Sequence, residues 1–367
     1  MKFACHKNTI TKEIAQALNF TSQRNSLSIL SYVLLETKDN NLSIKATDQK
    51  MGFSSSIGVE TIKDGSACLY CEKLLGILRN MPDDTLIFEQ KGDLMVVKSL
   101  NKEIEFELRI INKDKFPPLQ TDSQLTYFEV GQVDLFDMVD QTQFAISDDE
   151  TRFFLNGLYL EHEANGLVMV GTDGKRLSYI NRKTEQEIPS FAPVIIPGKF
   201  LTLLKRGGSS EGLLALALDE TMIFAKIGNQ VMYSNLINGQ FPNYRRVIPK
   251  TQPNIAKFKI DEMNEALNRV SLLVENKAKR LYLTISEGKI TVSSEESEFG
   301  QAQETIECDY SGQECRVALN YLFLVSPLRS MRGEYCALCF TDSNLAITVR
   351  PEPEQDYFHI IMPMQID

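Results

Sequence analysis

The feature that most constrains this chain is a pattern that occurs three times, about 122 residues apart, within 367 residues. The repeats of this pattern lie at residues 69–79, 195–205 and, more faintly, 317–327. Each joins a short apolar run to apolar residues at helical spacing, which predicts a strand end followed by an amphipathic helix. Leu74, Phe200 and Leu322 take equivalent places in the three helices. Self-similarity at a fixed period indicates tandem repeats of one structural unit.

A second pattern repeats in nearly the same register. Its repeats lie at residues 41–48, 166–173 and 288–295. Thr47, Thr172 and Ser294 are 125 and 122 residues apart, close to the 126 and 122 that separate Leu74, Phe200 and Leu322. Two independent patterns with matching offsets predict three repeats of one domain.

Each repeat is expected to open with a strand and a helix. These openings lie at residues 1–20, 127–144 and 257–274. Short alternating runs with Gly-containing turns follow, which predict antiparallel strands on either side of the second helix. Pro117 and Pro242 suit connections between repeats. We predict an α+β fold of three tandem repeats, each with two helices and antiparallel sheets. The predicted domains are 1–125, 126–252 and 253–367.

The charge of the chain is acidic and uneven. Asp plus Glu number 49 and Lys plus Arg 39, so the formal charge is −10, which excludes a uniformly basic coat but allows a local basic patch. Taken over residues 1–125, 126–250 and 251–367, the charge is 0, −3 and −7. There is no 18-residue apolar stretch and no leader-like N-terminus. We therefore expect a cytoplasmic protein with no membrane partner.

Motifs for catalysis and for metals are missing from the sequence. There is no phosphate-binding loop, nucleophile elbow or HExxH pair. The seven cysteines include two CxxC pairs, but about 265 residues separate them, so we expect buried thiols, no metal and no cofactor. Asp173 and Lys175 suggest an alternative, a nuclease or phosphotransferase. Asp48 repeats the place of Asp173, which favours a structural turn instead.

Basic residues concentrate on the predicted helices and their flanks. They are Lys12, Arg24, Lys73, Arg79, Lys199, Lys205, Arg206, Arg269, Lys277, Lys279, Arg280, Arg329 and Arg332. If these helices shared one surface, that surface would be positive on an acidic protein. The alternative is a set of ordinary solvated helix faces, and the acidic residues of 132–142 favour it.

Four motifs bring a family into view. They are LNG at 155–157, TDGKRL at 172–177, FPNYRR at 241–246 and IMPM at 361–364. With the threefold repeat, they make the whole chain resemble the bacterial replicative sliding clamp, the beta subunit of the DNA polymerase III holoenzyme. The resemblance implies a homodimer that closes head to tail into a ring around double-stranded DNA without reading its sequence. It also implies three kinds of protein partner: the replicative polymerase, the clamp loader and other proteins with a clamp-binding motif.

The resemblance also implies site residues. DNA contacts are expected at Arg24, Lys73, Arg152, Phe153, Phe154, Lys199 and Arg206. A pocket for partner peptides is expected at Leu155, Thr172, Gly174, Lys175, Arg176, Leu177, Pro242, Arg246, Val247, Ile360, Met362, Pro363 and Met364. The dimer contact is expected at Ile77, Leu78, Phe106, Leu272, Leu273, Glu298 and Glu304.

The charges at the expected dimer contact differ from the usual pattern of the family. The family commonly brings basic residues of the first domain to Glu298 and Glu304. Here Glu103 and Glu105 occupy that stretch, so Lys73 or Lys102 would have to supply the pairing, or the contact is weaker.

The favoured function is a processivity factor without catalysis. The alternative of an enzyme centred on Asp173 predicts magnesium-dependent turnover by the purified chain. A third hypothesis, a repeat scaffold that binds peptides but not DNA, predicts no topological retention on circular DNA.

Overall fold

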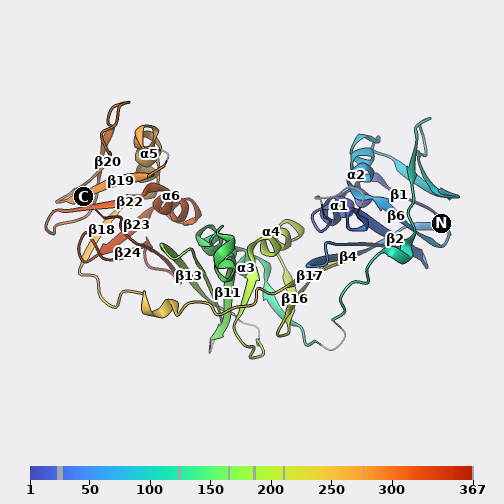
Figure 1. The fold of residues 1–367 in the computed structure, drawn as a ribbon, viewed down its shortest axis with the longest axis horizontal. Coiled ribbons are helices and arrows are strands. Elements are labelled where there is room, and N and C mark those ends of the chain that lie inside the picture. Colours follow the sequence, from blue (N-terminus) through green and yellow to red (C-terminus); the bar gives the residue numbers. More distant parts are fainter. Residues whose placement is uncertain are drawn as a thin grey trace. The chain divides into compact units, whose positions relative to one another are not determined.

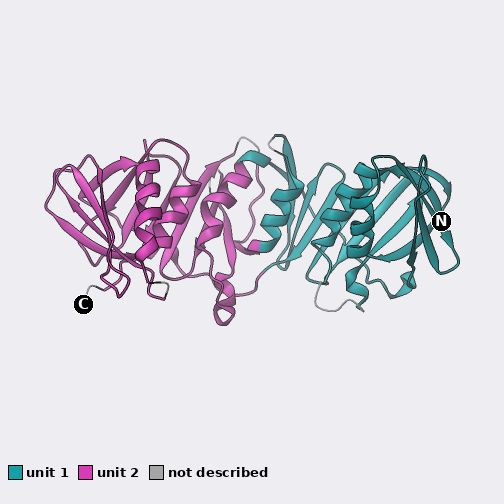
Figure 2. Ribbon diagram, turned by 90° about the horizontal axis from the view of Figure 1, so that it is seen from above, with its two compact units in different colours: residues 1–133, 199–236 teal, residues 134–198, 237–367 magenta. Residues whose placement is uncertain are grey.

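The computed structural model describes residues 1–22, 28–122, 125–163, 166–184, 187–209, 211–275 and 277–365. The chain divides into two compact units (Figure 2). Unit 1 comprises residues 1–133 and 199–236, and unit 2 comprises residues 134–198 and 237–367. The predicted boundaries near residues 125 and 252 do not coincide with these units and stay predictions.

Each repeat opens with a strand that runs directly into a helix, as the sequence predicted. These pairs are β1 (Lys2–His6) with α1 (Lys7–Leu18), β10 (Phe128–Gly131) with α3 (Gln132–Thr142), and β18 (Asn254–Lys259) with α5 (Ile260–Val270). The apolar side chains of α1 recur at Ile10, Ile14 and Ala17 and are fully buried, which is the helical spacing of one core-facing stripe.

A second strand and helix occupy the middle of each repeat. They are β6 (Gly65–Tyr70) with α2 (Cys71–Asn80), β14 (Val194–Pro197) with α4 (Gly198–Gly207), and β22 (Cys315–Asn320) with α6 (Tyr321–Ser330). Leu74 and Phe200 are fully buried, and the matching residue of α6 is Leu324, whereas Leu322 is half-buried. The expected equivalence of Leu322 is wrong by two residues because α6 begins later in its repeat. Helices α1 and α2 pack together, as do α5 and α6 (Figure 1).

Unit 1 contains two antiparallel sheets within its described residues. The five-stranded sheet has the order β5-β1-β7-β8-β9, with β5 at Glu60–Lys63, β7 at Thr85–Lys91, β8 at Leu94–Ser99 and β9 at Glu105–Arg109. The eight-stranded sheet has the order β10-β15-β16-β17-β4-β3-β2-β6, with β2 at Tyr32–Lys38, β3 at Asn41–Thr47, β4 at Met51–Gly58, β15 at Leu213–Leu218, β16 at Met222–Ile227 and β17 at Gln230–Asn235.

Unit 2 repeats this arrangement in its own described residues. Its eight-stranded sheet has the order β14-β11-β12-β13-β25-β24-β23-β18, with β11 at Gly157–Glu163, β12 at Gly166–Thr172, β13 at Arg176–Lys183, β23 at Tyr335–Phe340, β24 at Ile347–Glu352 and β25 at Tyr357–Ile361. Its four-stranded sheet has the order β21-β20-β19-β22, with β19 at Arg280–Ser286, β20 at Lys289–Ser294 and β21 at Gln303–Glu307.

The two eight-stranded sheets each combine strands from two neighbouring repeats. In unit 1, β17 pairs antiparallel with β4, and in unit 2, β13 pairs antiparallel with β25. Strands β9 and β21 lie at the edges of the five- and four-stranded sheets. The antiparallel α+β architecture predicted from the sequence is therefore confirmed, and two strand edges remain at the outer sheets.

Six short 3-10 helices connect these elements in the described part of the chain. They are η1 (Ile29–Ser31), η2 (Lys113–Lys115), η3 (Gln143–Ala145), η4 (Glu150–Leu155), η5 (Tyr244–Arg246) and η6 (Ser271–Leu273). The longest α-helix among the described residues, α1, has 12 residues. No described helix has the length and apolar character to cross a bilayer.

Candidate functional site

The turn between β12 and β13 is built by its own side chains. The Thr172 hydroxyl donates to the Arg176 carbonyl at 2.6 Å and accepts from the Gly174 amide at 3.1 Å. Asp173 Oδ1 accepts from the amides of Lys175 at 2.8 Å and Arg176 at 3.1 Å. Gly174 has a φ of +88°, which glycine adopts without strain. The TDGKR motif therefore forms a rigid turn.

The carboxylate that suggested an enzyme is used by this turn. Besides the two amides, Asp173 accepts from the Arg176 guanidinium, with Oδ2 to Nε at 3.0 Å. Asp48 accepts from the amides of Lys50 and Met51 in the same way at the equivalent turn of the first repeat. A position that recurs with the same turn geometry is architectural, which supports the structural interpretation of Asp173.

A cavity of about 270 Å³ lies beside this turn. It is lined by Leu155, Thr172, Gly174, Lys175, Arg176, Leu177, Pro242, Asn243, Tyr244, Val247, Ile360 and Met362. Leu155, Leu177 and Ile360 are buried, whereas Val247 is 52% and Met362 44% exposed. A mostly apolar cavity with an exposed, adaptable mouth is suited to short apolar side chains of a partner.

Ten of the thirteen residues predicted for the peptide pocket line this single cavity. Arg246, Pro363 and Met364 are not among its lining residues, and Asn243 and Tyr244 join it. Both additions fall inside the FPNYRR motif, so the motif marked the right segment and missed which of its side chains face the cavity.

The η5 wall of the cavity is held by a buried carboxylate. Glu161 on β11 is 7% exposed and accepts hydrogen bonds from the Tyr244 hydroxyl and from Arg245. Burial and the hydrogen bond to Glu161 raise the pKa of Tyr244, so the phenol keeps its proton and donates it to the carboxylate. Arg245 also reaches Glu163. This network fixes the side of the cavity that no backbone ladder reaches.

The C-terminal segment closes another side. The Met362 amide donates to the Lys175 carbonyl at 2.9 Å, and the Met364 amide donates to the Ala318 carbonyl at 2.7 Å. Residues 362–364 thus run from the β12–β13 turn to β22. Pro363 and Met364 hold this segment in place next to the cavity.

The residues predicted for DNA binding fall into two groups. Lys73 on α2 and both Lys199 and Arg206 on α4 are exposed. Arg152 bonds Asp149 at 3.0 Å and the Asp173 carbonyl at 3.0 Å, so it braces η4 against the turn. The predicted Arg24 lies outside the described residues.

The adjacent phenylalanines differ in their surroundings. Phe153 is 53% exposed, while Phe154 packs against the buried cluster that contains Leu155 and Phe241. Their rings meet edge to face at 5.9 Å between centroids. Only Phe153 therefore offers a large surface.

The residues predicted for the dimer contact are also unequal. Phe106 is 37% and Leu272 81% exposed, and Ile77 and Leu273 are half-buried. Leu78 has no exposed surface, so it belongs to the core beneath α2 rather than to the surface of a single chain. Phe299, which the sequence reasoning missed, is 80% exposed. It lies between Glu298 and Gly300 in a polar loop, where no apolar pattern points to it.

Glu304 is paired within its own chain. Arg269 on α5 donates to both carboxylate oxygens, Nη2 to Oε1 at 2.6 Å and Nε to Oε2 at 2.8 Å. These hydrogen bonds hold the pKa of Glu304 below its usual value. The expected pairing of Glu304 with a basic residue of the first domain is therefore not required to neutralise it.

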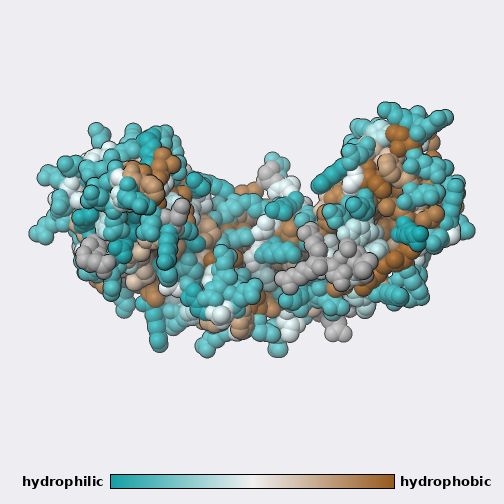
Figure 3. All heavy atoms as spheres, turned by 45° about the horizontal axis from the view of Figure 1, so that its top comes forward, coloured by the Kyte–Doolittle hydropathy of each residue, from teal (hydrophilic) through white to brown (hydrophobic). Residues whose placement is uncertain are grey.

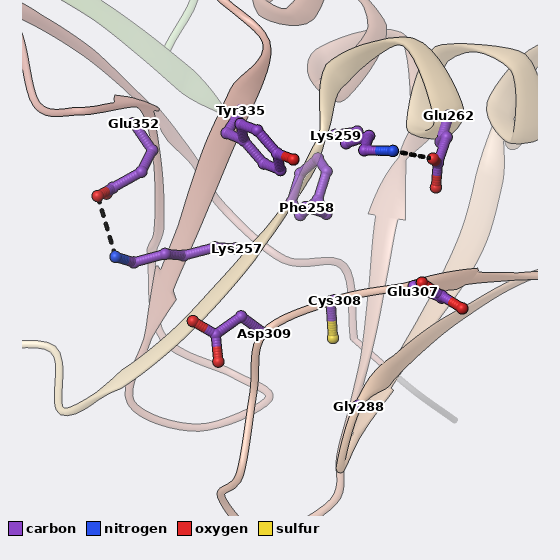
Figure 4. Close-up of a pocket in the computed structure, with 10 residues that line it drawn as sticks. All are labelled: Lys257, Phe258, Lys259, Glu262, Gly288, Glu307, Cys308, Asp309, Tyr335 and Glu352. Carbon is purple, nitrogen blue, oxygen red and sulfur yellow. Dashed lines mark hydrogen bonds and ion pairs between the residues drawn. The ribbon is translucent and has the colours of Figure 1, made fainter.

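A larger cavity, of about 500 Å³, lies elsewhere in unit 2 (Figure 4). Its cations are neutralised, with Lys257 bonded to Glu352 at 2.9 Å and Lys259 to Glu262 at 3.1 Å. Burial raises the pKa of the Cys308 thiol at its wall to about 11, so the thiol stays protonated at neutral pH. No residue predicted to be functional lines this cavity.

The surface of the described residues is largely hydrophilic in the view of Figure 3. Apolar surface gathers on unit 1, at the right of that view. Among the large exposed apolar residues of unit 1 are Ile62, Leu100 and Phe106.

Comparisons with known proteins agree on one family. Models of the N-terminal, central and C-terminal domains of the DNA polymerase III beta subunit match residues 1–120, 129–243 and 245–365. A beta sliding clamp of Treponema pallidum is 38% identical over 371 residues, with both chains covered completely. The beta sliding clamp of Escherichia coli K12 is 27% identical over 369 residues, again with complete coverage.

Solved structures give the same result. A sliding clamp from Pseudomonas aeruginosa bound to griselimycin superposes with a TM-score of 0.94 at 25% identity, covering all of both chains. The beta sliding clamp of Caulobacter crescentus superposes with a TM-score of 0.93 at 26% identity, covering all of this chain and 99% of that one.

The buried carboxylate behind the cavity gives a testable prediction. Replacing Glu161 by Ala leaves the buried Tyr244 hydroxyl without its acceptor, which costs about 1–3 kcal/mol of the free energy of unfolding. The measurement is urea unfolding followed by circular dichroism. Glu163→Ala is the matched control, because it removes only a more exposed ion pair with Arg245, and should cost about 1 kcal/mol or less. Equal losses in the two variants would contradict the role of Glu161.

Proposed function

The chain belongs to the DNA polymerase III beta subunit family, and from this premise we propose which of its surfaces perform the work of a sliding clamp. It is a DNA sliding clamp of replication, a processivity factor without catalysis of its own. Its partners are DNA, the replicative polymerase, the clamp loader and a second copy of itself. Tethering raises the effective concentration of a polymerase at its template, so repeated encounters are avoided.

One observation carries the proposal for how the ring closes. Two pairings between neighbouring repeats are made inside the chain, β17 with β4 and β13 with β25. A third pairing of the same kind would join the third repeat to the first, and its two strands, β21 and β9, are the ones left at sheet edges. The unlike edges of one chain suit a head-to-tail contact, which closes a ring when its rotation closes. We assign β9 of one subunit to β21 of the other.

The DNA contacts are assigned to exposed basic side chains on helices. Lys73, Lys199 and Arg206 are exposed on α2 and α4, and Arg24 joins them by resemblance. Such cations bind phosphates and read no base edges, which lets a ring slide. Phe153 adds an exposed aromatic surface, while Arg152 and Phe154 support it from behind.

The cavity beside the β12–β13 turn is assigned to partner peptides. Its buried floor takes apolar side chains, and Met362 and Val247 at its mouth adapt to different ones. Proteins that carry a clamp-binding motif would compete for it, the polymerase and the clamp loader among them. We place the clamp in the cytoplasm, where replication proteins meet the chromosome, and we keep three domains with boundaries near residues 125 and 252.

The function is tested by topological retention. The clamp is placed on a nicked circular plasmid by a clamp loader with ATP, and the DNA is separated from free protein by gel filtration. The labelled clamp should elute with circular DNA and be lost when a restriction enzyme linearises it, because a ring slides off a free end. Equal retention on circular and linear DNA would contradict encirclement and favour ordinary binding.

The assigned DNA contacts predict a change in salt dependence. Replacing Lys73, Lys199 and Arg206 by Ala removes three phosphate contacts, which should lower the slope of log affinity against log salt by about 2.7 on duplex DNA. Fluorescence anisotropy with a labelled linear duplex measures it. The matched control replaces Lys38, Lys63 and Lys91, three exposed lysines on β2, β5 and β7. If both triple variants change the slope equally, the contacts lie elsewhere.

The peptide assignment predicts a selective loss of affinity. Val247→Asp places a charge at the mouth of an apolar cavity, and binding of a labelled peptide that carries Leu and Phe should weaken at least tenfold. Leu345→Asp is the control, since Leu345 is also 52% exposed but does not line the cavity. Anisotropy gives the affinities and light scattering shows that both variants stay dimeric. Unchanged affinity for Val247→Asp would move the peptide site away from this cavity.

A further inference from the structure

The three repeats share one numbering of their outer strands. In each repeat the residue four places before the first helix starts a ladder across the sheet. These ladders run Phe3, Phe88, Val97, Phe106 in the first repeat, Phe128, Leu216, Ala225, Met232 in the second, and Ala256, Leu338, Val349, His359 in the third. Phe106, Met232 and His359 therefore hold equivalent positions on β9, β17 and β25.

The other strands of the joins align in the same way. From the residue four places before the second helix, the ladders run Ala67, Leu35, Ile44, Ser55, then Val194, Leu160, Met169, Ile180, then Val317, Leu283, Val292, Glu304. Ser55, Ile180 and Glu304 are therefore equivalent on β4, β13 and β21. Ile180 is buried, and Glu304 is turned toward α5, where Arg269 holds it.

Both joins inside the chain use one register. Ser55 lies opposite Gln230, two residues before Met232, and Ile180 lies opposite Tyr357, two residues before His359. The same register at the third join places Glu304 opposite the partner's Ile104, two residues before Phe106. One residue further along, Gln303 lies opposite the partner's Glu105. Two residues beyond that, Gln301 lies opposite the partner's Glu107.

We propose that the ring closes in this register and that Gln301 and Gln303 recognise the acidic row of β9. The proposal rests on the closure by β9 and β21 proposed above. Alternate residues of a strand share a face, so Glu103, Glu105 and Glu107 form one row. The facing row on the other subunit is Gln301, Gln303 and Thr305, which carries no charge. Carboxylates opposite each other would repel, whereas an amide donates a hydrogen bond to a carboxylate.

The neighbouring charges are already arranged for this contact. Lys98 bonds Glu105 at 2.7 Å from the adjacent strand, so one oxygen of that carboxylate remains for an amide donor. On the opposite face, Glu304 is held by Arg269 and meets the apolar Ile104 of the partner subunit rather than another carboxylate. The partner's Phe106 lies opposite Ala302, whose small side chain leaves room for the ring. Both acidic strands can therefore meet without a pair of unpaired like charges.

The first test is a charge introduced opposite the acidic row. Gln303→Glu should raise the dissociation constant of the dimer at least tenfold at low salt, because it sets a carboxylate against the partner's Glu105 at both junctions of the ring. Adding Glu105→Gln to this variant should restore the dissociation constant to within threefold of the parent. Sedimentation velocity over a dilution series measures both. Gln313→Glu, at an exposed residue of the same unit, is the matched control and should leave the constant unchanged.

A second test reads the register directly. Cysteines introduced by Gln303→Cys and Glu105→Cys would lie directly opposite, at a separation a disulfide spans, so mild oxidation should give a covalent dimer on a non-reducing gel. Gln303→Cys with Phe106→Cys differs by one residue, and neighbouring side chains point to opposite faces, so it should not cross-link. The parent chain with its seven native thiols is the background control.

The outcomes separate this inference from the proposed closure. An unchanged dimer in Gln303→Glu, failure of Glu105→Gln to restore it, or cross-linking of the 303–106 pair instead of the 303–105 pair would each overturn the register. If the parent clamp is retained on circular DNA in those cases, the ring itself stands. A parent chain that is monomeric and not retained on circular DNA would instead overturn the closure on which the register rests.

Discussion

The unsatisfied backbone of a sheet edge is the constraint on which this structure depends. Each strand carries donors and acceptors along its length, and an edge strand offers them to any chain that fits. Two pairs of edges are joined inside the chain, β17 with β4 and β13 with β25. The charges of β9 protect the remaining edge, because Glu105 and Glu107 repel most other strands. In the proposed ring the same charges select the one strand whose facing row is neutral.

The joins inside the chain differ chemically from the one proposed between subunits. At the tenth residue of α1 and of α3 lie Gln16 and Gln141, both buried, which donate to the carbonyls of Leu203 and Ser330 at 2.9 and 2.7 Å. The tenth residue of α5 is Arg269, which is exposed and paired with Glu265 and Glu304. Opening a join sealed by buried amides strands polar groups, whereas hydrated charges part at lower cost. A ring of this construction opens between its subunits before it opens within them.

Sequence reasoning reached the features that local pattern encodes. The repeat follows from helix starts and from the Thr-Asp turn, and the pocket segments follow from contiguous motifs. What it missed depends on contacts between distant residues. Glu161 and Tyr244 are 83 positions apart, and the pairing of Arg269 with Glu304 spans 35, so no local spacing reveals either. The shift from Leu322 to Leu324 has a related cause, because a longer connection between β20 and β21 displaces everything after it.

The cavity combines a fixed frame with an adaptable mouth. The turn of Thr172 and Asp173, the Glu161 carboxylate behind Tyr244, and the ladder through Ile360 hold the frame. Met362 and Val247 stand exposed at the entrance, and a methionine repacks around different side chains with little change in energy. Affinity then comes from the shared floor and tolerance from the mouth, so several partners use one site and exclude one another. A dimer carries two such cavities, and a polymerase held at one leaves the other open to the next protein that the DNA requires.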